Sequence, residues 1–307
     1  MRPRIFPPVL LLAAALSVPM TASGAAGPCP PDGLTRAQLS ELRGAKWEVS
    51  GDARREALAV GLLGCLADPD PALRDEIGFE ALQSWMRADK LGAPALHTIR
   101  RSLLARLQEQ DAAGFSQPFA ALVLAELARA DRRKPFLSPA ERSALVQGGA
   151  AWLAGLRDYR GFSETEGWRH GVAHGADLML QLALNPALGK ADHEAMLAAI
   201  GAQVMPTGPF FPHFYQFGEG ERLMAPVFYL ARRDTLSAGD WEAWFARLAA
   251  EGKPDAHGEQ AGMASLARRH NLKAFLLPLY VALAGTPDTA QRARLLPIVT
   301  KTLKPLD

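Results

Sequence analysis

The chain has 307 residues, of which 34 are basic and 32 acidic, and its formal net charge is +2 at pH 7. Arg2 and Arg4 account for this excess, so the rest of the chain is formally neutral. This balance argues against nucleic acid or an anionic membrane surface as the partner. A chain of this length can bury a large core within one domain.

Residues 1–26 have the three-part composition of a secretory signal peptide: two arginines, an apolar run at 9–16 and small residues near the end. The apolar run is shorter than the roughly 20 apolar residues that span a bilayer. We therefore expect cleavage near 22–26, no membrane span afterwards, and a periplasmic or secreted mature protein. The alternative is a retained membrane anchor.

Cys29 and Cys65 are the two cysteines of the chain. In an oxidising compartment a lone pair often forms a disulfide, and here the bond would fasten a flexible leader, residues 27–34, to the second helix. The alternative is two unpaired thiols, with Cys65 packed on the apolar face of its helix. Pro28 stands where lipoprotein processing requires a small residue, so we do not expect a lipid anchor.

Residues 35–307 are expected to form a single all-helical domain. N-capping residues and prolines mark the helix starts, and apolar residues then recur at helical spacing. No run alternates apolar and polar residues between hairpin turns, so we expect almost no strands. The expected helices begin at Thr35, Asp52, Asp70–Pro71, Pro94, Pro118 and Ser138–Pro139, and others occupy about 190–204, 219–232, 237–250, 258–269, 271–284 and 287–302.

Roughly a dozen helices with short loops predict an all-α fold, an irregular α/α superhelix of HEAT-like helix pairs. The segment DPDPALRDEIGFEAL, residues 68–82, looks like a HEAT-type repeat helix. The helices are not strictly periodic and no repeat consensus recurs, so a regular HEAT array does not follow from the pattern.

The segment RGFSETEGWRHGVAHGAD, residues 160–177, gathers the side chains best suited to chemistry. A helix that begins near Glu166 would place His170, His174 and Asp177 on one narrow face. Two imidazoles four residues apart can chelate a divalent metal ion, and a carboxylate one turn later can be a third ligand or can orient an imidazole. A glycine replaces the glutamate of the HExxH signature, so that protease mechanism is not supported.

Two other interpretations of the same cluster remain open: a buried hydrogen-bonded network that closes a helix end, and a metal-free binding or catalytic pocket. Gly167, Gly171 and Gly175 recur on the neighbouring face, where each costs the helix about 1 kcal/mol. Close approach of another helix is the expected reason, and a ligand is the alternative. We expect Trp168 in the core, with a stacking platform for a ligand as the alternative.

Two further charged groups are candidates of lower weight. Glu219 and Glu221 lie in the first turn of a helix, where carboxylates favour the helix dipole, and Arg222 follows them. The functional interpretation places one of these carboxylates opposite His174 across a groove. The charged run Arg74–Glu76 is expected on a solvated helix face.

Four segments in order resemble the bacterial domain-of-unknown-function family 2785: LRDEIGFEAL, FAALVLAELARAD, YRGFSETEGWRHGVAHGADLMLQLA and GEGERLMAPVFYL. The core GW-x-H-x3-H-x-AD is the most specific part, and the similarity covers about residues 40–300. The resemblance implies an all-helical, HEAT-like fold and no established activity. One departure is Gln117–Pro118, where the family pattern has an Arg-Ser pair, so no role for an arginine is expected there. The positions that the resemblance highlights are Arg160, Gly161, Gly167, Trp168, His170, His174, Asp177, Glu219, Glu221, Arg222 and Leu223.

We therefore expect an exported binding or scaffold module for an unknown small molecule or an envelope protein, with a polar groove around the His170, His174 and Asp177 face. The alternative is a hydrolase-type enzyme, in one version with a divalent metal on those three residues. A third hypothesis is docking of envelope proteins on a concave solenoid surface. The candidate binding residues are Arg160, Trp168, His170, His174, Asp177, Glu219, Glu221 and Arg222.

Overall fold

The computed structural model describes residues 27–206, 212–251, 262–287 and 289–306. Within these ranges the chain is all-α apart from one two-stranded hairpin, as predicted. The expected signal peptide lies outside the described residues, as does the first turn of the helix predicted at 258–269. Across the same ranges, no helix combines the length and the apolar character that a bilayer span requires.

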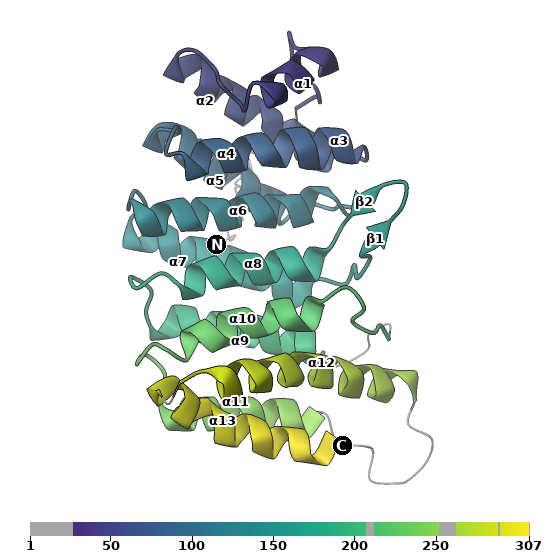
Figure 1. The fold of residues 1–307 in the computed structure, drawn as a ribbon, viewed down its shortest axis with the longest axis vertical. Helices are drawn as coiled ribbons and strands as arrows, with labels where there is room; N and C mark the ends of the chain where they lie inside the picture. Colours follow the sequence, from purple (N-terminus) through teal and green to yellow (C-terminus); the bar gives the residue numbers. More distant parts are fainter. Residues whose placement is uncertain (1–26, 207–211, 252–261, 288, 307) are drawn as a thin grey trace, which may run out of the picture.

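The helices follow one another along the long axis of the molecule (Figure 1). In chain order the elements are α1 (Arg36–Gly44), α2 (Asp52–Gly61), the 3-10 helix η1 (Leu62–Ala67), α3 (Pro71–Leu73), the π-helical turn η2 (Arg74–Phe79), α4 (Glu80–Arg87), α5 (Ala93–Arg106), α6 (Ser116–Arg133), α7 (Pro139–Gly155), β1 (Phe162–Ser163), β2 (Gly167–Trp168), α8 (Gly171–Ala183), α9 (Lys190–Val204), α10 (Glu219–Leu230), α11 (Ala238–Glu251), α12 (Met263–Gly285), α13 (Ala290–Leu303) and η3 (Lys304–Leu306).

Two rows of helices build the stack. One row contains α4, α6, α8, α10 and α12, each in contact with the next, and the other contains α2, α5, α7, α9 and α11. The helices of the first row run in the same direction, so their N-terminal ends lie along one edge (Figure 1). The β1–β2 hairpin projects from this edge, beside the start of α8.

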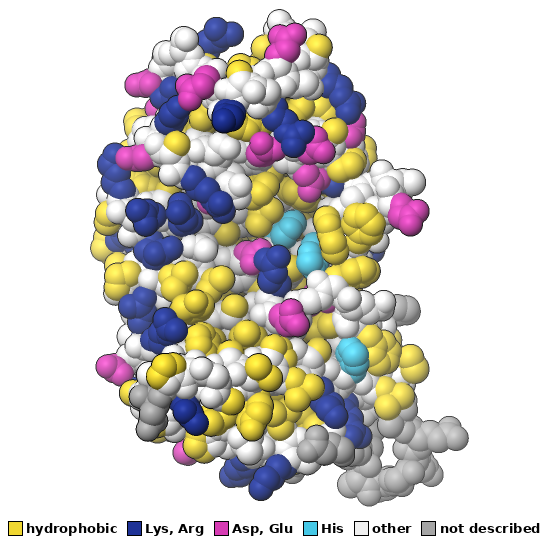
Figure 2. All heavy atoms as spheres, viewed as in Figure 1, with side chains coloured by type: hydrophobic (Ala, Val, Ile, Leu, Met, Phe, Trp, Pro, Cys, Tyr) yellow, Lys and Arg dark blue, Asp and Glu magenta, His cyan; other side chains and the backbone are white. Residues whose placement is uncertain are grey.

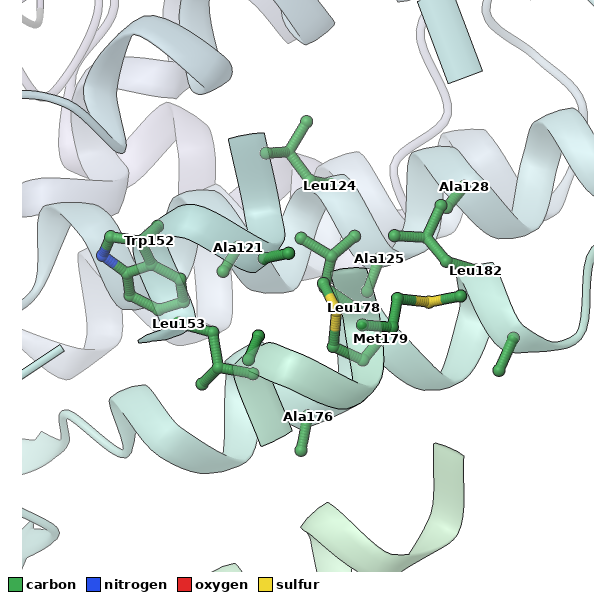
Figure 3. Packing of buried hydrophobic residues seen from close by; sticks show 14 of the residues in the cluster. Ala121, Leu124, Ala125, Ala128, Trp152, Leu153, Ala176, Leu178, Met179 and Leu182 are labelled. Carbon is green, nitrogen blue, oxygen red and sulfur yellow. The ribbon is translucent and has the colours of Figure 1, made fainter. Parts of the chain in front are cut away.

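The centre of the core lies where α6, α7 and α8 meet (Figure 3). α6 presents the small buried residues Ala121, Ala125 and Ala128, which allow α8 to come close, and α8 fills the space with larger side chains such as Leu178 and Leu182. Burial of each leucine contributes roughly 1.5–3 kcal/mol. This packing holds the start of α8 in a fixed place beside α6.

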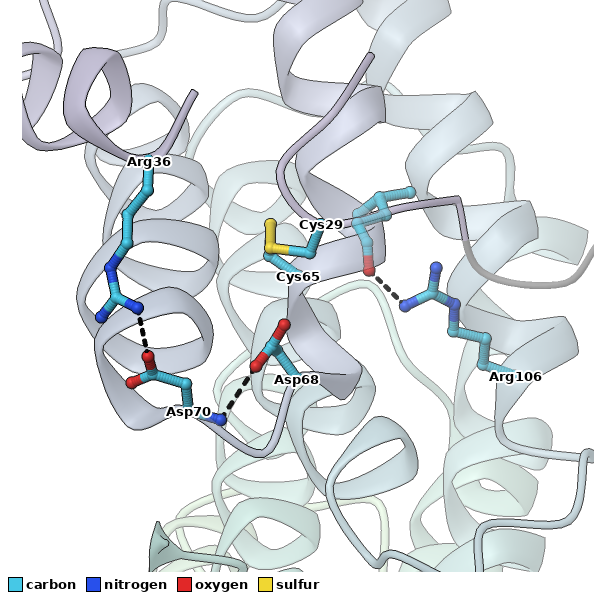
Figure 4. Close-up of a disulfide and its surroundings, with 7 residues drawn as sticks. Cys29, Arg36, Cys65, Asp68, Asp70 and Arg106 are labelled. Carbon is cyan, nitrogen blue, oxygen red and sulfur yellow. Dashed lines mark hydrogen bonds and ion pairs between the residues drawn. A yellow bond between two sulfur atoms is a disulfide. The ribbon is translucent and has the colours of Figure 1, made fainter. Parts of the chain in front are cut away.

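The disulfide between Cys29 and Cys65 that the sequence predicts is present, and its sulfur atoms are 2.05 Å apart (Figure 4). It attaches the leader to η1. A Cβ atom at Gly64 would lie 2.2 Å from the carbonyl oxygen of Gly27, so glycine is required where the leader backbone crosses η1. The side chain of Pro31 packs on Gly61, where a Cβ atom would lie 3.1 Å from it. The leader is therefore held by covalent and packing contacts.

One prediction about the helices is wrong: the two helices expected at 258–269 and 271–284 form the single helix α12. Asn271, at the predicted break, is fully buried. Its side chain accepts a hydrogen bond from the backbone N–H of Tyr215 at 2.9 Å and donates one to the carbonyl of His213 at 3.1 Å. These contacts with the segment before α10 satisfy a polar side chain inside a continuous helix.

Candidate functional site

The helix that carries the candidate cluster begins later than predicted. We expected it to start near Glu166, but the chain first forms β2 and α8 starts at Gly171. Gly167 has φ +71° and His170 has φ +52°, and both values lie in the left-handed region. The backbone therefore turns at His170, which precedes α8 as its N-cap residue and does not lie on the helix face with His174.

Two of the three glycines that recur every fourth residue do allow close packing between helices. A Cβ atom at Gly175 would lie 2.7 Å from the side chain of Leu153, and one at Gly171 would lie 3.0 Å from that of Leu156. The third, Gly167, is in the hairpin and not on the helix. The prediction that these glycines allow another helix to come close is confirmed for Gly171 and Gly175, which let α7 approach α8. The prediction that all three glycines lie on one face of a helix is wrong.

His170 is held between a carbonyl and an aromatic ring. Its Nε2 lies 3.0 Å from the carbonyl oxygen of Phe217 and donates to it, which leaves Nδ1 as the acceptor nitrogen. The ring of Trp168 stacks on the imidazole with centroids 4.6 Å apart. Burial lowers the pKa of His170, and the positive charge of Arg222 lowers it further against the effect of the carbonyl hydrogen bond. The ring is therefore neutral at pH 7.

His174 is buried in the interior, with 8% of its surface exposed. Its Nδ1 donates to the carbonyl oxygen of Pro118 at 3.2 Å, and the ring of Phe119 packs edge-on against it, with centroids 5.1 Å apart. Burial lowers the pKa of His174 to about 3, reinforced by the charge that His170 carries when acid protonates it and by the charge of Arg222. This imidazole is neutral throughout the physiological range.

Asp177 does not contact either imidazole by a hydrogen bond. Both of its carboxylate oxygens accept from Nη1 of Arg222, at 2.6 and 2.7 Å, and the pair joins α8 to α10. Burial raises the pKa of Asp177, and the charge of Arg222 opposes this rise. Over the residues that the structure describes, no three His, Cys, Asp or Glu side chains gather into a set that could hold a metal ion. The proposed ligand set of His170, His174 and Asp177 is thus not formed in this geometry.

The two carboxylates at the start of α10, Glu219 and Glu221, lie in different environments. Glu219 is buried, and it accepts a hydrogen bond from the backbone N–H of Phe217 at 2.8 Å. Gly218, between them, has φ +80°, which glycine adopts without strain. Glu221 is exposed on the first turn. The structure does not join either carboxylate to His174 by a hydrogen bond.

Arg160 secures the base of the hairpin. Its guanidinium binds the carboxylate of Asp158, with Nη2 and Oδ2 2.6 Å apart, and donates to the carbonyl of Ala112 at 3.1 Å. The Asp158 carboxylate raises the pKa of Arg160 further. Arg160 therefore ties the segment before β1 to the loop that precedes α6.

Arg74 is another residue that sequence reasoning placed wrongly. We expected it on a solvated face, but it is completely buried in the turn η2. Its guanidinium donates to the carbonyl of Glu166 at 2.8 Å and to two carbonyls of the preceding turn, and it forms an ion pair with Asp75. It lies 4.2 and 4.9 Å from the ring centroids of Phe115 and Phe119. Arg74 thus fixes the hairpin against α6, and no local signal distinguishes it from an exposed helix charge.

Three exposed aromatic rings, Phe162, Trp168 and Phe217, form what we call the aromatic surface. They are 50%, 38% and 37% exposed, and Trp168 lies 5.0 Å from Phe162 and 5.7 Å from Phe217 between centroids. The prediction that Trp168 packs in the core is wrong, although each of the other five tryptophans is at most 6% exposed. A Cβ atom at Gly161 would lie 2.0 Å from the Phe217 ring, so this glycine makes room for it.

Figure 2 shows histidine side chains near the middle of one face, next to hydrophobic, acidic and basic side chains. Two cavities of the described part of the chain lie elsewhere. One of about 550 Å³ separates the leader from α5, and one of about 830 Å³ separates α11 from α13. Neither is lined by His174, Asp177 or Glu221.

Comparisons with curated proteins and with solved structures give no match. The family described as "Protein of unknown function (DUF2785)" matches residues 103–281, which is more than half of the chain. The matched range is shorter than the expected 40–300. It includes the hairpin, both histidines, the aromatic surface and Arg222, whereas Arg74 lies outside it. The chain belongs to this family, the proteins of unknown function DUF2785.

Proposed function

We propose that this protein is a binding module and that it contacts a partner protein through the aromatic surface. The observation that carries the proposal is the exposure of Phe162, Trp168 and Phe217, in which the Trp168 ring contacts Phe162 of the same hairpin and Phe217 of a distant segment. Exposed apolar clusters on a soluble domain mark interaction sites. Tryptophan and arginine are enriched among the residues that dominate binding energies, and Arg160 and Arg222 are exposed nearby.

The rigidity of the aromatic surface supports the same function. The buried Arg74 holds the carbonyl of Glu166 in the hairpin, and His170 binds the carbonyl of Phe217 while it stacks on Trp168. Rings held in place before binding lose little conformational entropy when a partner covers them. The polar groups around the rings thus act as supports.

The hydrolase alternative has no comparable support. A general base needs a positioned partner and a free path to the substrate. Here both imidazoles donate to backbone carbonyls, and Asp177 is paired with Arg222. The two-row stack supports a HEAT-like superhelix as the scaffold, and the disulfide supports an exported protein in an oxidising compartment.

Photocrosslinking tests the proposal. A photoreactive benzoylphenylalanine in place of Phe162 should form an adduct with a partner in extract of the source cells. An excess of wild-type protein should abolish the adduct by competition. An excess of the Trp168→Ala variant should not, because it lacks the central ring of the surface.

The same photoreactive residue in place of Val281 is the matched control, since Val281 is 66% exposed but lies on α12. It should give no adduct that wild-type protein removes. Equal adducts at both positions would contradict the proposal, as would equal competition by Trp168→Ala with an unchanged melting temperature.

A further inference from the structure

Four arginines gather where α6 and α10 end, and we call them the arginine cluster. Arg129, Arg132 and Arg133 lie on the last two turns of α6, and Arg233 follows the end of α10. Figure 2 shows basic side chains along the edge of the molecule opposite the hairpin, where these helices end. The chain as a whole is nearly balanced in charge, so this surplus of positive charge is local. The cluster is separate from the aromatic surface and does not depend on the function proposed for it.

Two members of the cluster converge on the end of α8, which lies between α6 and α10. Arg132 donates from Nη2 to the side-chain oxygen of Gln181 at 3.2 Å, and Arg233 donates from Nη2 to the carbonyl oxygen of Leu184 at 2.6 Å. The two acceptors are three residues apart and therefore lie on the same side of α8. Because both acceptors are neutral, these hydrogen bonds hold the guanidinium groups in place and leave their charges uncompensated.

No carboxylate of the described ranges forms an ion pair with any arginine of the cluster. The acids next to it in the sequence, Asp131 and Asp234, are bound to Arg142 and Arg294. Burial lowers the pKa of Arg132, and the charges of the other three arginines lower it further. Every charge that acts on this guanidinium is therefore positive.

The helix dipole does not account for the whole cluster. Arginines are favourable near a helix C-terminus, but each terminus carries only about half a negative charge. The ends of α6, α8 and α10 together thus offer roughly 1.5 negative charges to four positive ones. The remaining positive charge is suited to an anion that binds at the surface.

A phosphate monoester suits this arrangement better than a carboxylate does. It carries nearly two negative charges at pH 7 and presents three acceptor oxygens, so guanidinium groups from different helices can donate to it together. A carboxylate carries one charge and two oxygens in one plane. Arginine is also the side chain whose fork of donors matches phosphate oxygens. We infer that the arginine cluster binds a phosphate monoester, carried by a small molecule or by a lipid head group.

Titration calorimetry of the purified protein with glycerol 3-phosphate, at low ionic strength to limit screening, tests the inference. Glycerol 3-phosphate should bind, and glycerol, which lacks the phosphate, should not. Vesicles of phosphatidylcholine with added phosphatidic acid present the same phosphate group on a lipid, and cosedimentation measures binding to them. Binding of glycerol 3-phosphate would assign the site to soluble ligands, whereas binding to these vesicles alone would assign it to lipids.

A variant with both Arg129→Gln and Arg133→Gln should bind about tenfold more weakly, because hydrogen bonds between charged groups are lost. Its melting temperature should not fall. Neither side chain forms an ion pair or a hydrogen bond with another described residue, and like charges four residues apart destabilise a helix.

Arg54→Gln is the matched control, since Arg54 is exposed on α2 and likewise forms no ion pair within the described ranges. It should leave the affinity unchanged. Trp168→Ala should also leave it unchanged, which separates this site from the aromatic surface.

Three outcomes would overturn the inference. The first is that the wild-type protein binds neither glycerol 3-phosphate nor the vesicles with phosphatidic acid. The second is that the double variant binds as tightly as the wild type, which would assign these arginines no role in binding. The third is an equal loss of affinity in Arg54→Gln, which would show a general attraction of anions to the protein.

Discussion

His174 is a side chain whose protonation the fold changes strongly. Its ring lies against Phe119 and donates to the carbonyl of Pro118, so water cannot solvate a protonated form. The charge of Arg222, and that of His170 once acid protonates it, oppose a proton on His174, and its pKa falls to about 3. The imidazole is a neutral hydrogen-bond donor that joins α8 to α6, and a proton added to it would leave a buried charge.

The pKa of His174 predicts that acid destabilises the protein through this residue. In the unfolded chain an imidazole binds a proton below about pH 6.5, whereas the folded ring stays neutral to about pH 3. Between these values the unfolded state binds more protons, so the free energy of unfolding falls as the pH falls. From pH 7 to about pH 5.5, His174 should account for a loss of about 1 kcal/mol.

Urea unfolding of wild type and His174→Gln at both pH values measures this contribution. The loss on acidification should be smaller in the variant by that amount, whatever its stability at pH 7. His170→Gln is the comparison, because burial lowers the pKa of His170 as well, so part of the loss should depend on it. An identical loss in His174→Gln and wild type would show that the ring is not buried as a neutral group.

Among the secondary-structure elements, the contact between α10 and α12 depends most strictly on one glycine. A Cβ atom at Gly220 would lie 2.4 Å from the carbonyl oxygen of Ala274 and 3.0 Å from the backbone nitrogen of Phe275. Both neighbours are backbone atoms inside a helix, which cannot move as a flexible side chain can. The two helices must separate to admit even a methyl group, and α10 carries Arg222 and the buried Glu219 of the candidate site.

Gly220→Ala should therefore lower the free energy of unfolding by about 1–3 kcal/mol, the usual range for overpacking a core. Gly155→Ala, near the end of α7, is the control, because no atom lies within 4 Å of the added methyl group. Its higher helix propensity should leave stability unchanged or raise it by up to about 1 kcal/mol. Equal effects of the two substitutions in urea unfolding would refute the close approach.

Local signals were sufficient where an element begins with its own cap. α9 runs over the predicted residues 190–204, and the capping box at Ser138 starts α7 as expected. Signals failed where a distant contact decides the structure. The spacing of His170 and His174 is helical, yet two left-handed residues and the anchor at Arg74 produce a hairpin before α8. The spacing of two histidines and the charge of an arginine do not reveal contacts with residues far away in the sequence.

At the scale of the whole molecule, the disulfide closes the end of the stack where α1 and α2 lie. It joins residues 36 positions apart and fastens a segment that otherwise has few buried side chains. A cross-link of this span restricts the unfolded chain and so stabilises the folded one. Because each helix contacts mainly its neighbours, a weakened end affects the adjacent helices first.

Reduction of the disulfide should lower the free energy of unfolding by about 3–4 kcal/mol, the value expected for a loop of this length. Urea unfolding with and without a thiol reductant measures it. A variant with both Cys29→Ser and Cys65→Ser should unfold like the reduced protein and should not respond to the reductant. Two free thiols in the denatured, unreduced protein would rule out the bond.

The fluorescence of Trp168 can report on its surroundings without an added label. Five indoles lie in the interior, whereas this one meets solvent at the hairpin. A water-borne quencher such as iodide should extinguish the emission of one chromophore and spare the others. Binding of a partner over Trp168 can therefore be followed by the loss of iodide quenching, in dilute solution and in the native chain.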